Sequence, residues 1–214
     1  MPENPQQERI ARALAPFVPA SSLEEVSRWI DQHKIQLTIT RHRHSVLGDY
    51  RRPDRQRGHR ISVNGSLNRY AFLITLVHEM AHLTTWLKHG DRVNPHGVEW
   101  KAEFRLLMHQ FLLTAVFPPE LNRALRQYMD DPAASSCTDE TLMRVLRSYD
   151  SRPAGVLVSD LEDQEMFLFR NSRLFRRESR IRKRIRCTEV KTGRIYLFSP
   201  VAEVKRWTPE AKTS

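Results

Sequence analysis

Residues 69–88, RYAFLITLVHEMAHLTTWLK, have the composition of a buried α-helix. Asn68 is a suitable N-cap and Gly90 follows the last turn, so both ends carry helix boundary signals. Apolar side chains occur almost all the way round this helix, which indicates burial on most of its sides. Glu79 is the only carboxylate in the run. Because an unpaired buried charge is costly, Glu79 requires a compensating cation or an open cavity.

Two histidines flank this glutamate. His78 and His82 are four positions apart, so their rings lie on one face of the helix, about one turn from each other. The H-E-x-x-H spacing is typical of two zinc ligands with the intervening glutamate as general base. The competing interpretation is a pair of histidines hydrogen-bonded at a helix contact, with Glu79 as their ion-pair partner. A third ligand would favour the metal.

A candidate for this third ligand is His96. It follows His82 by 14 residues, after a polar turn and just before a second helical pattern. That pattern is an apolar stripe at helical spacing, formed by Trp100, Phe104, Leu107, Met108, Phe111 and Leu112. A hairpin of the two helices would return His96 to the first two histidines. Glu99 and Glu103 are alternative ligands, since zinc also binds carboxylate oxygen.

Three segments, ISVNGSLN, VHEMAHL and PHGVEWKAEF, together resemble the SprT-like zinc metallopeptidase family, whose eukaryotic relative Spartan is a protease of DNA–protein crosslinks. The resemblance covers about residues 35–112 well and the end of the chain more loosely. It implies that His96 joins His78 and His82 as a ligand of Zn²⁺, with Glu79 as the catalytic base. Many bacterial members carry a C-terminal zinc ribbon with two Cys-x-x-Cys pairs, and this chain has none.

The expected fold class is α+β, with a zincin-like metalloprotease core and a small C-terminal antiparallel β element. We expect an N-terminal helical segment over residues 1–34, a SprT-like metalloprotease domain over 35–150 and a basic, β-rich element over 151–214. Residues 35–41 and 59–64 alternate as paired strands. The edge strand before the H-E-x-x-H helix is a candidate partner for an extended substrate. The sequence leaves open which strand is exposed.

The connection between the two strands, RHRHSVLGDYRRPDRQRG, is polar and basic. We interpret His42 and His44 as part of a solvated face rather than as metal ligands. The arginines of this connection are candidates for contact with phosphate groups at the rim of the expected active-site cleft. They are Arg41, Arg43, Arg51, Arg52, Arg55 and Arg57.

The basic excess of the chain lies near its end. Residues 170–186, RNSRLFRRESRIRKRIR, hold eight Arg and one Lys against a single Glu. A field of one sign is typical of nucleic-acid binding, although a solvated face that aids solubility has the same charge. No DNA-reading motif is present, so we expect sequence-tolerant contacts to the backbone of DNA, single strands included. The candidate contacts are Arg176, Arg177, Arg180, Arg182, Lys183 and Arg184.

Other features narrow the class of protein. The start of the chain lacks a signal-peptide pattern and no run approaches the ~20 apolar residues of a membrane span, so we expect a cytoplasmic protein without membrane contact. Cys137 and Cys187 are too few for a disulfide framework and are interpreted as ordinary thiols. For the oxyanion-stabilising group, Tyr70 and exposed histidines are candidates.

The expected function is zinc-dependent hydrolysis of peptide bonds, with proteins associated with DNA as substrates. The first alternative is a nucleic-acid-binding protein with a non-catalytic metal site. The second is a metal-dependent scaffold whose partner is another protein. Glu79 favours the enzyme, because a structural metal site has no need of that base.

Overall fold

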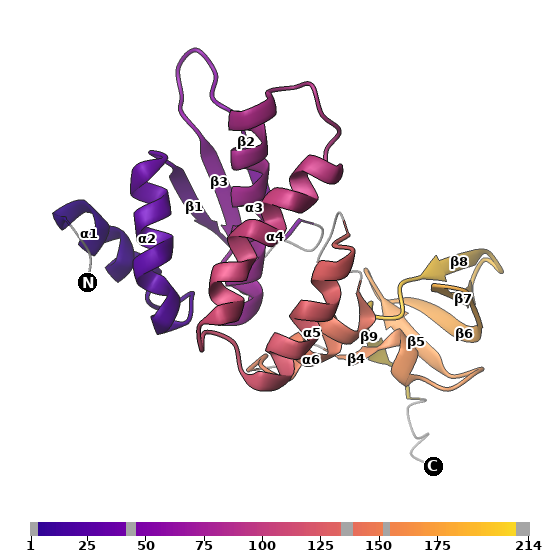
Figure 1. The fold of residues 1–214 in the computed structure, drawn as a ribbon. Coiled ribbons are helices and arrows are strands. Elements are labelled where there is room, and N and C mark those ends of the chain that lie inside the picture. The colour runs from indigo at the N-terminus through magenta and orange to yellow at the C-terminus, as the bar shows by residue number, and fades with distance from the viewer. Residues whose placement is uncertain (1–3, 42–45, 134–138, 152–154, 209–214) are drawn as a thin grey trace. The chain divides into compact units, whose positions relative to one another are not determined.

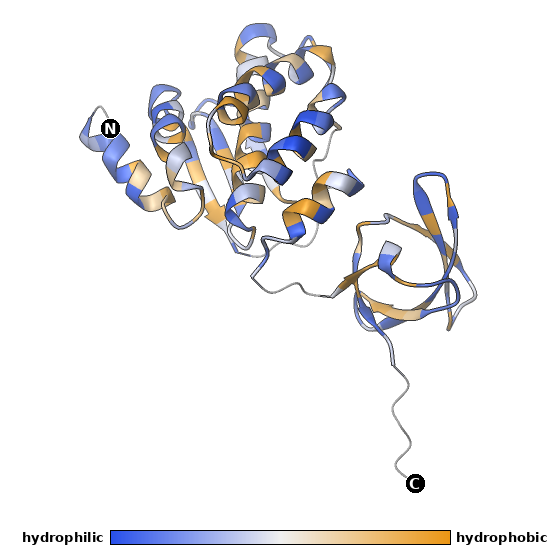
Figure 2. Cartoon of the chain, turned by 60° about the horizontal axis from the view of Figure 1, so that its bottom comes forward, coloured by the Kyte–Doolittle hydropathy of each residue, from blue (hydrophilic) through white to orange (hydrophobic). Residues whose placement is uncertain are grey.

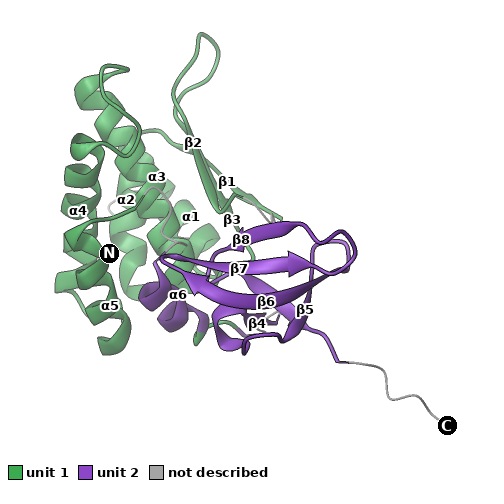
Figure 3. Ribbon diagram, turned by 90° about the vertical axis from the view of Figure 1, so that its right-hand side faces the viewer, with its two compact units in different colours: residues 1–136, 148–150 green, residues 137–147, 151–214 purple. Residues whose placement is uncertain are grey.

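The computed structural model describes residues 4–41, 46–133, 139–151 and 155–208. His42, Arg43, His44 and Cys137 lie outside these ranges. The chain divides into two compact units, residues 1–136 with 148–150 and residues 137–147 with 151–214 (Figure 3). Both units combine helices with strands, so the predicted α+β class is confirmed. The functional boundaries proposed after residues 34 and 150 remain predictions.

Unit 1 contains a three-stranded sheet in the order β1-β3-β2 (Figure 1). The predicted pairing of the strands around 35–41 and 59–64 is confirmed, because β1 (Gln36–Thr40) lies parallel to β3 (Arg60–Asn64). The third strand, β2 (Gly48–Arg51), pairs antiparallel with β3 and was missed in the sequence. Its four residues, GDYR, have no apolar alternation to reveal a strand. The described edges of the sheet are therefore β1 and β2, and β3 is central.

Unit 1 also contains the following described helices. They are α1 (Pro5–Leu14), α2 (Leu23–Gln32), α3 (Arg69–His89), α4 (Val98–Leu113) and α5 (Pro119–Asp130), with a short 3-10 turn at Ala20–Ser22. Several carry hydrophobic and hydrophilic residues on different sides (Figure 2). Helix α3 is the exception, because its buried residues run from Phe72 to Thr85 and lie on nearly every side. It packs against α4 as well as β2 and β3.

The ends of α3 follow the predicted signals. The side-chain oxygen of Asn68 accepts hydrogen bonds from the backbone N–H groups of Tyr70 and Ala71, at 3.1 and 2.9 Å. Gly90 ends the helix with a φ of 62°, a conformation that glycine adopts without strain. Large side chains such as Phe72 and Phe104 are fully buried around α3, and burial of each contributes about 1.5–3 kcal/mol.

Unit 2 is a six-stranded sheet in the order β4-β9-β5-β6-β7-β8, preceded by helix α6 (Glu140–Arg147). Its strands are β4 (Val156–Leu157), β5 (Met166–Phe169), β6 (Arg173–Ile181), β7 (Arg184–Glu189), β8 (Ile195–Phe198) and β9 (Glu203–Arg206), with a 3-10 turn at Val158–Asp160. All pairings are antiparallel, as predicted. Its core is aromatic, with Phe167, Phe175 and Phe198 in mutual ring contact. No described helix of either unit is both long and apolar enough to cross a membrane.

Candidate metal centre

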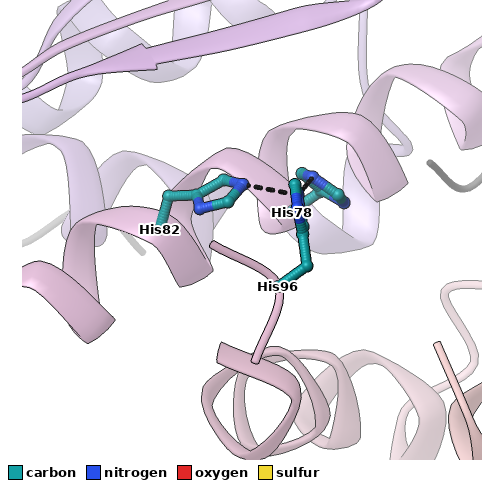
Figure 4. A group of neighbouring side chains, drawn as sticks. All are labelled: His78, His82 and His96. Atoms are coloured by element: carbon teal, nitrogen blue, oxygen red, sulfur yellow. Dashed lines mark hydrogen bonds between the residues drawn. The ribbon is translucent and has the colours of Figure 1, made fainter. Parts of the chain in front are cut away.

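Three histidines converge in unit 1. His78 and His82 project from one face of α3, and His96 comes from the loop that precedes α4 (Figure 4). The backbone of His96 has a φ of 59°, and the turn behind it is closed by a 3.0 Å hydrogen bond from Gly97 N–H to the carbonyl of Asn94. This tight turn directs the imidazole back toward α3.

The spacing of the ring nitrogens suits a metal ion. The Nε2 atom of His96 lies 3.2 Å from Nε2 of His78 and 3.0 Å from Nε2 of His82. The ligand atoms of all three lie within 4.8 Å of one another. Two nitrogens bound at 2.0–2.1 Å to a tetrahedral zinc ion lie roughly 3.3 Å apart. The three rings therefore fit a shared metal ion, and a tetrahedral ion held by three histidines has a fourth position for another ligand.

The electrostatics of the cluster favour neutral rings. Burial, and then repulsion from His82 and His96, lowers the pKa of His78 to about 3. Burial and repulsion from His96 lower the pKa of His82 to about 4, and burial also lowers the pKa of His96. Neutral imidazole is the form that binds a metal ion. The cluster is thus ready to accept a cation at neutral pH.

Trp100 is a part of the site that sequence reasoning assigned only to the core. Its ring centroid lies 4.6 Å from that of His78, 5.4 Å from that of His82 and 4.7 Å from that of His96. The indole is fully buried in α4 and contacts all three imidazoles. It restricts the orientation of each ring. The only signal in the sequence was its position four residues after His96.

The two rival ligands do not join the cluster. Oε1 of Glu103 accepts a 2.5 Å hydrogen bond from Nζ of Lys88. Glu99 is not part of the described group of possible metal ligands. Tyr70 lies at the start of α3, roughly 12 Å along the helix from His78 and packed against Phe117 and Tyr149. It is therefore remote from the histidines. The sequence offered no way to exclude it.

Glu79 follows His78 on α3 and is 6% exposed. Its side chain lies against the backbone of Gly48 in β2. The glutamate therefore stands at the contact between the helix and an edge strand of the sheet.

A cleft of about 660 Å³ opens beside His82. Its walls include the aromatic residues Tyr50, Trp86 and Trp100. The Tyr50 hydroxyl is 3.0 Å from Nδ1 of His59, and burial raises the pKa of Tyr50 to about 12. The tyrosine therefore faces the cleft as a neutral hydroxyl at ordinary pH.

Two arginines of the predicted phosphate-contacting rim, Arg51 and Arg52, line this cleft together with Arg60, and all three are ion-paired. Arg51 pairs with Asp49 at 2.7 Å, Arg60 pairs with Asp54 at 2.8 Å, and Arg52 pairs with Asp91. The other described arginines of the predicted rim, Arg41, Arg55 and Arg57, do not line this cleft.

The predicted DNA contacts fall into two groups in unit 2. Arg177 pairs with Asp163, Arg180 pairs with Glu140 at 2.9 Å, and Arg176 lies 3.9 Å from Glu178. In contrast, Arg182, Lys183 and Arg184 are exposed at the turn between β6 and β7. None of these three has an ion pair with a described acid.

The comparison with protein families agrees with the geometry. Residues 21–122 match the model of the SprT-like family, a range that includes the three-stranded sheet, α3, His96 and α4. Members of this family are generally metallopeptidase-like. Searches of curated proteins and of solved structures gave no match. The predicted resemblance is therefore confirmed, and this chain carries a SprT-like region across residues 21–122.

Proposed function

We propose that the protein is a zinc-dependent metallopeptidase with a zincin-like core. The main observation in its favour is the convergence of three imidazoles, with Nε2 of His96 at 3.2 Å from Nε2 of His78 and 3.0 Å from Nε2 of His82. Glu79 lies on α3, the helix that carries His78 and His82. Three neutral histidines are a donor set that suits Zn²⁺ and leaves a fourth position open. When bound, the ion supplies a Lewis acid that polarises a carbonyl and activates water.

The residues of the chain have separate roles in this proposal. His78, His82 and His96 hold the ion, and Trp100 holds their rings in place. Glu79 accepts a proton from the attacking water and returns it to the nitrogen of the leaving amine. Its buried position limits competition from bulk solvent for that proton.

Strand β2 supports a peptide as the substrate. It is an edge of the described sheet, and it touches Glu79 through Gly48. An extended peptide that adds to this edge by backbone hydrogen bonds would run past the glutamate and along the cleft. We therefore propose β2, rather than β1, as the substrate-docking strand.

Proteins associated with DNA are the proposed substrates. Arg182, Lys183 and Arg184 form an exposed cationic turn, which supports sequence-tolerant contact with the DNA backbone. The same cationic turn also supports the alternative function, a nucleic-acid-binding protein with a non-catalytic metal site. Peptide hydrolysis distinguishes the two.

The deciding experiment is Glu79→Gln. The substitution removes the proton acceptor without removing a metal ligand, so metal content and melting temperature should equal those of the parent. Hydrolysis of an unfolded protein substrate should fall by a factor of about 10² or more. The matched control is Glu99→Gln, which changes a carboxylate of α4 that is outside the histidine cluster.

Two outcomes would argue against Glu79 as the general base. Parental hydrolysis in the Glu79→Gln variant, with metal retained, would remove Glu79 as the base. Loss of metal together with activity would instead make Glu79 a structural partner of the site.

A further inference from the structure

The side chain of Glu79 packs so closely against the backbone of Gly48 that a residue with a Cβ atom would not fit at position 48. A Cβ atom built on Gly48 would lie 2.9 Å from Cγ of Glu79 and 2.7 Å from Cγ2 of Thr75, and nearer still to Oε1 of Glu79. Real Cβ atoms essentially never approach other atoms within 3.0 Å. The carboxylate of Glu79 therefore occupies the space that a side chain at position 48 would need.

The backbone conformation of Gly48 does not explain this glycine. The glycines with positive φ are Gly90 and Gly193 among the described residues, and Gly48 is in regular antiparallel register with Val63 of β3. An L-residue could adopt that conformation without strain. The need for glycine at this position comes from close packing against α3.

The two helix residues that meet Gly48 are one turn apart. Thr75 and Glu79 are at positions i and i+4 of α3, so they form the two sides of a groove on the helix surface. The backbone of β2 lies in this groove at Gly48. Thr75 is itself fixed, because its hydroxyl donates a 2.8 Å hydrogen bond to the carbonyl of Ala71. Of the two sides, Glu79 has the longer and more adjustable side chain.

We infer that Gly48 is a positioning residue for Glu79: the bare α-carbon of β2 lets the glutamate lie in one orientation against the strand edge. This inference rests on the proposed role of Glu79 as the base. A methyl group at position 48 would turn the carboxylate away or push β2 off the helix. Either change displaces the base from a peptide docked along β2.

The first test is Gly48→Ala, with metal content, kcat and KM measured on the metal-loaded protein. We expect unchanged metal content, a kcat lowered about 10- to 100-fold and a KM within a few-fold of the parent, because misplacement of a catalytic group by about 1 Å has effects of this size. The matched control is Gly58→Ala. A Cβ there would meet only the carbonyl of Lys34, at an ordinary 3.9 Å, so the parental kcat is expected.

The second test separates the two contacts. Gly48→Ala combined with Thr75→Ser relieves the contact with Cγ2 while keeping a hydroxyl for Ala71. If Glu79 is the group that matters, kcat stays low in this double variant. Recovery of the parental kcat would overturn the inference, because it would show that displacement of β2 by Thr75 caused the loss.

The third test needs no activity. Melting temperatures of the metal-free protein are compared in a cycle of Gly48→Ala and Glu79→Ala. Gly48→Ala should lower the melting temperature of the parent, and should lower it clearly less when Glu79 has been replaced by alanine. Equal decreases in both backgrounds would show that Gly48 does not act through Glu79 and would overturn the inference.

Failure of this inference is distinct from failure of the proposed function. A Glu79→Gln variant that loses hydrolysis, together with a Gly48→Ala variant of parental kcat, would refute the positioning role alone. Parental hydrolysis in Glu79→Gln would refute the proposed function. The melting-temperature cycle would still decide whether Gly48 positions the side chain.

Discussion

The position of the His96 side chain depends on an unusual backbone conformation. Its φ of 59° lies in the left-handed region, which few residues other than glycine adopt, and such conformations occur often at functional sites. Here the conformation closes the turn before α4 and brings the His96 ring to His78 and His82. His78 and His82 need no unusual backbone conformation, because their spacing of four residues on α3 already places both rings on one face.

The first prediction at this scale is that His96→Ala lowers bound metal as severely as His78→Ala. Each substitution removes one of the three proposed ligands, and a site with two remaining histidines is expected to hold a metal ion far more weakly. Metal per chain, measured after dialysis, is the readout. The control is His109→Ala, an exposed histidine on α4. Parental metal content in the His96 variant would exclude it as a ligand.

At the scale of elements, β6, β7 and β8 are joined by a half-exposed cluster around the ion pair of Arg173 with Glu189. Nε of Arg173 lies 2.7 Å from Oε1 of Glu189, and the same guanidinium donates a 2.7 Å hydrogen bond to the Tyr196 hydroxyl. The guanidinium also lies over the rings of Phe175 and Tyr196, at 5.1 and 5.0 Å. Arg173 therefore contributes to the stability of the sheet, although the charge pattern groups it with nucleic-acid contacts.

This pair predicts a dependence of stability on pH. Hydrogen bonds from Arg173, and then from Thr192, lower the pKa of Glu189 from 4.5 to about 2. Between these values the unfolded state binds a proton at this carboxyl and the folded state does not. The stabilisation from Glu189 is therefore fully present above pH 4.5 and is lost as the pH falls toward about 2.

The measurement compares melting temperatures of the parent and of Glu189→Gln from neutral pH down to about pH 2. The parent should be the more stable protein at neutral pH, and the difference should shrink as the pH falls. Glu162→Gln, at an exposed carboxylate, is the control and should show no such convergence. A constant difference between parent and Glu189→Gln across the range would contradict the assignment.

At the scale of the whole molecule, the eight Arg and one Lys of residues 170–186 overstate the charge that is free to bind a polyanion. Acidic residues from outside this run form ion pairs with it: Asp163 pairs with Arg177, and Glu140 pairs with Arg180. The cationic turn formed by Arg182, Lys183 and Arg184 remains. The charge available to DNA is therefore smaller and more localised than the composition indicates.

This predicts a modest salt dependence of DNA binding. Contact with about three phosphates gives a slope of log affinity against log salt of roughly −2 to −3, for single strands and duplexes alike. Replacement of Arg182, Lys183 and Arg184 by serine should bring the slope close to zero. The charge-matched control replaces Arg9, Arg12 and Arg123, three exposed arginines of unit 1, and should keep the slope. A parental slope in the first variant would exclude this turn as the DNA contact.

Features that depend on near neighbours in the chain were predictable from the sequence. The limits of α3 follow from Asn68 and Gly90, and the alignment of His78 with His82 follows from the helical repeat. The pairing of β1 with β3 followed from two alternating runs. The helix features need only interactions within a few residues, so composition and spacing are sufficient evidence for them. The strand pairing joins positions 24 residues apart, and its parallel direction was decided by the tertiary structure.

The tertiary structure decided the features that join distant segments. From the residues alone, the third ligand stayed open among His96, Glu99 and Glu103, because choosing between them requires the path of the loop before α4. The contact of Gly48 with Glu79 and the ion pair of Arg180 with Glu140 join segments about 30 and 40 residues apart. Such contacts depend on how whole elements pack, and no local pattern of residue types encodes that packing.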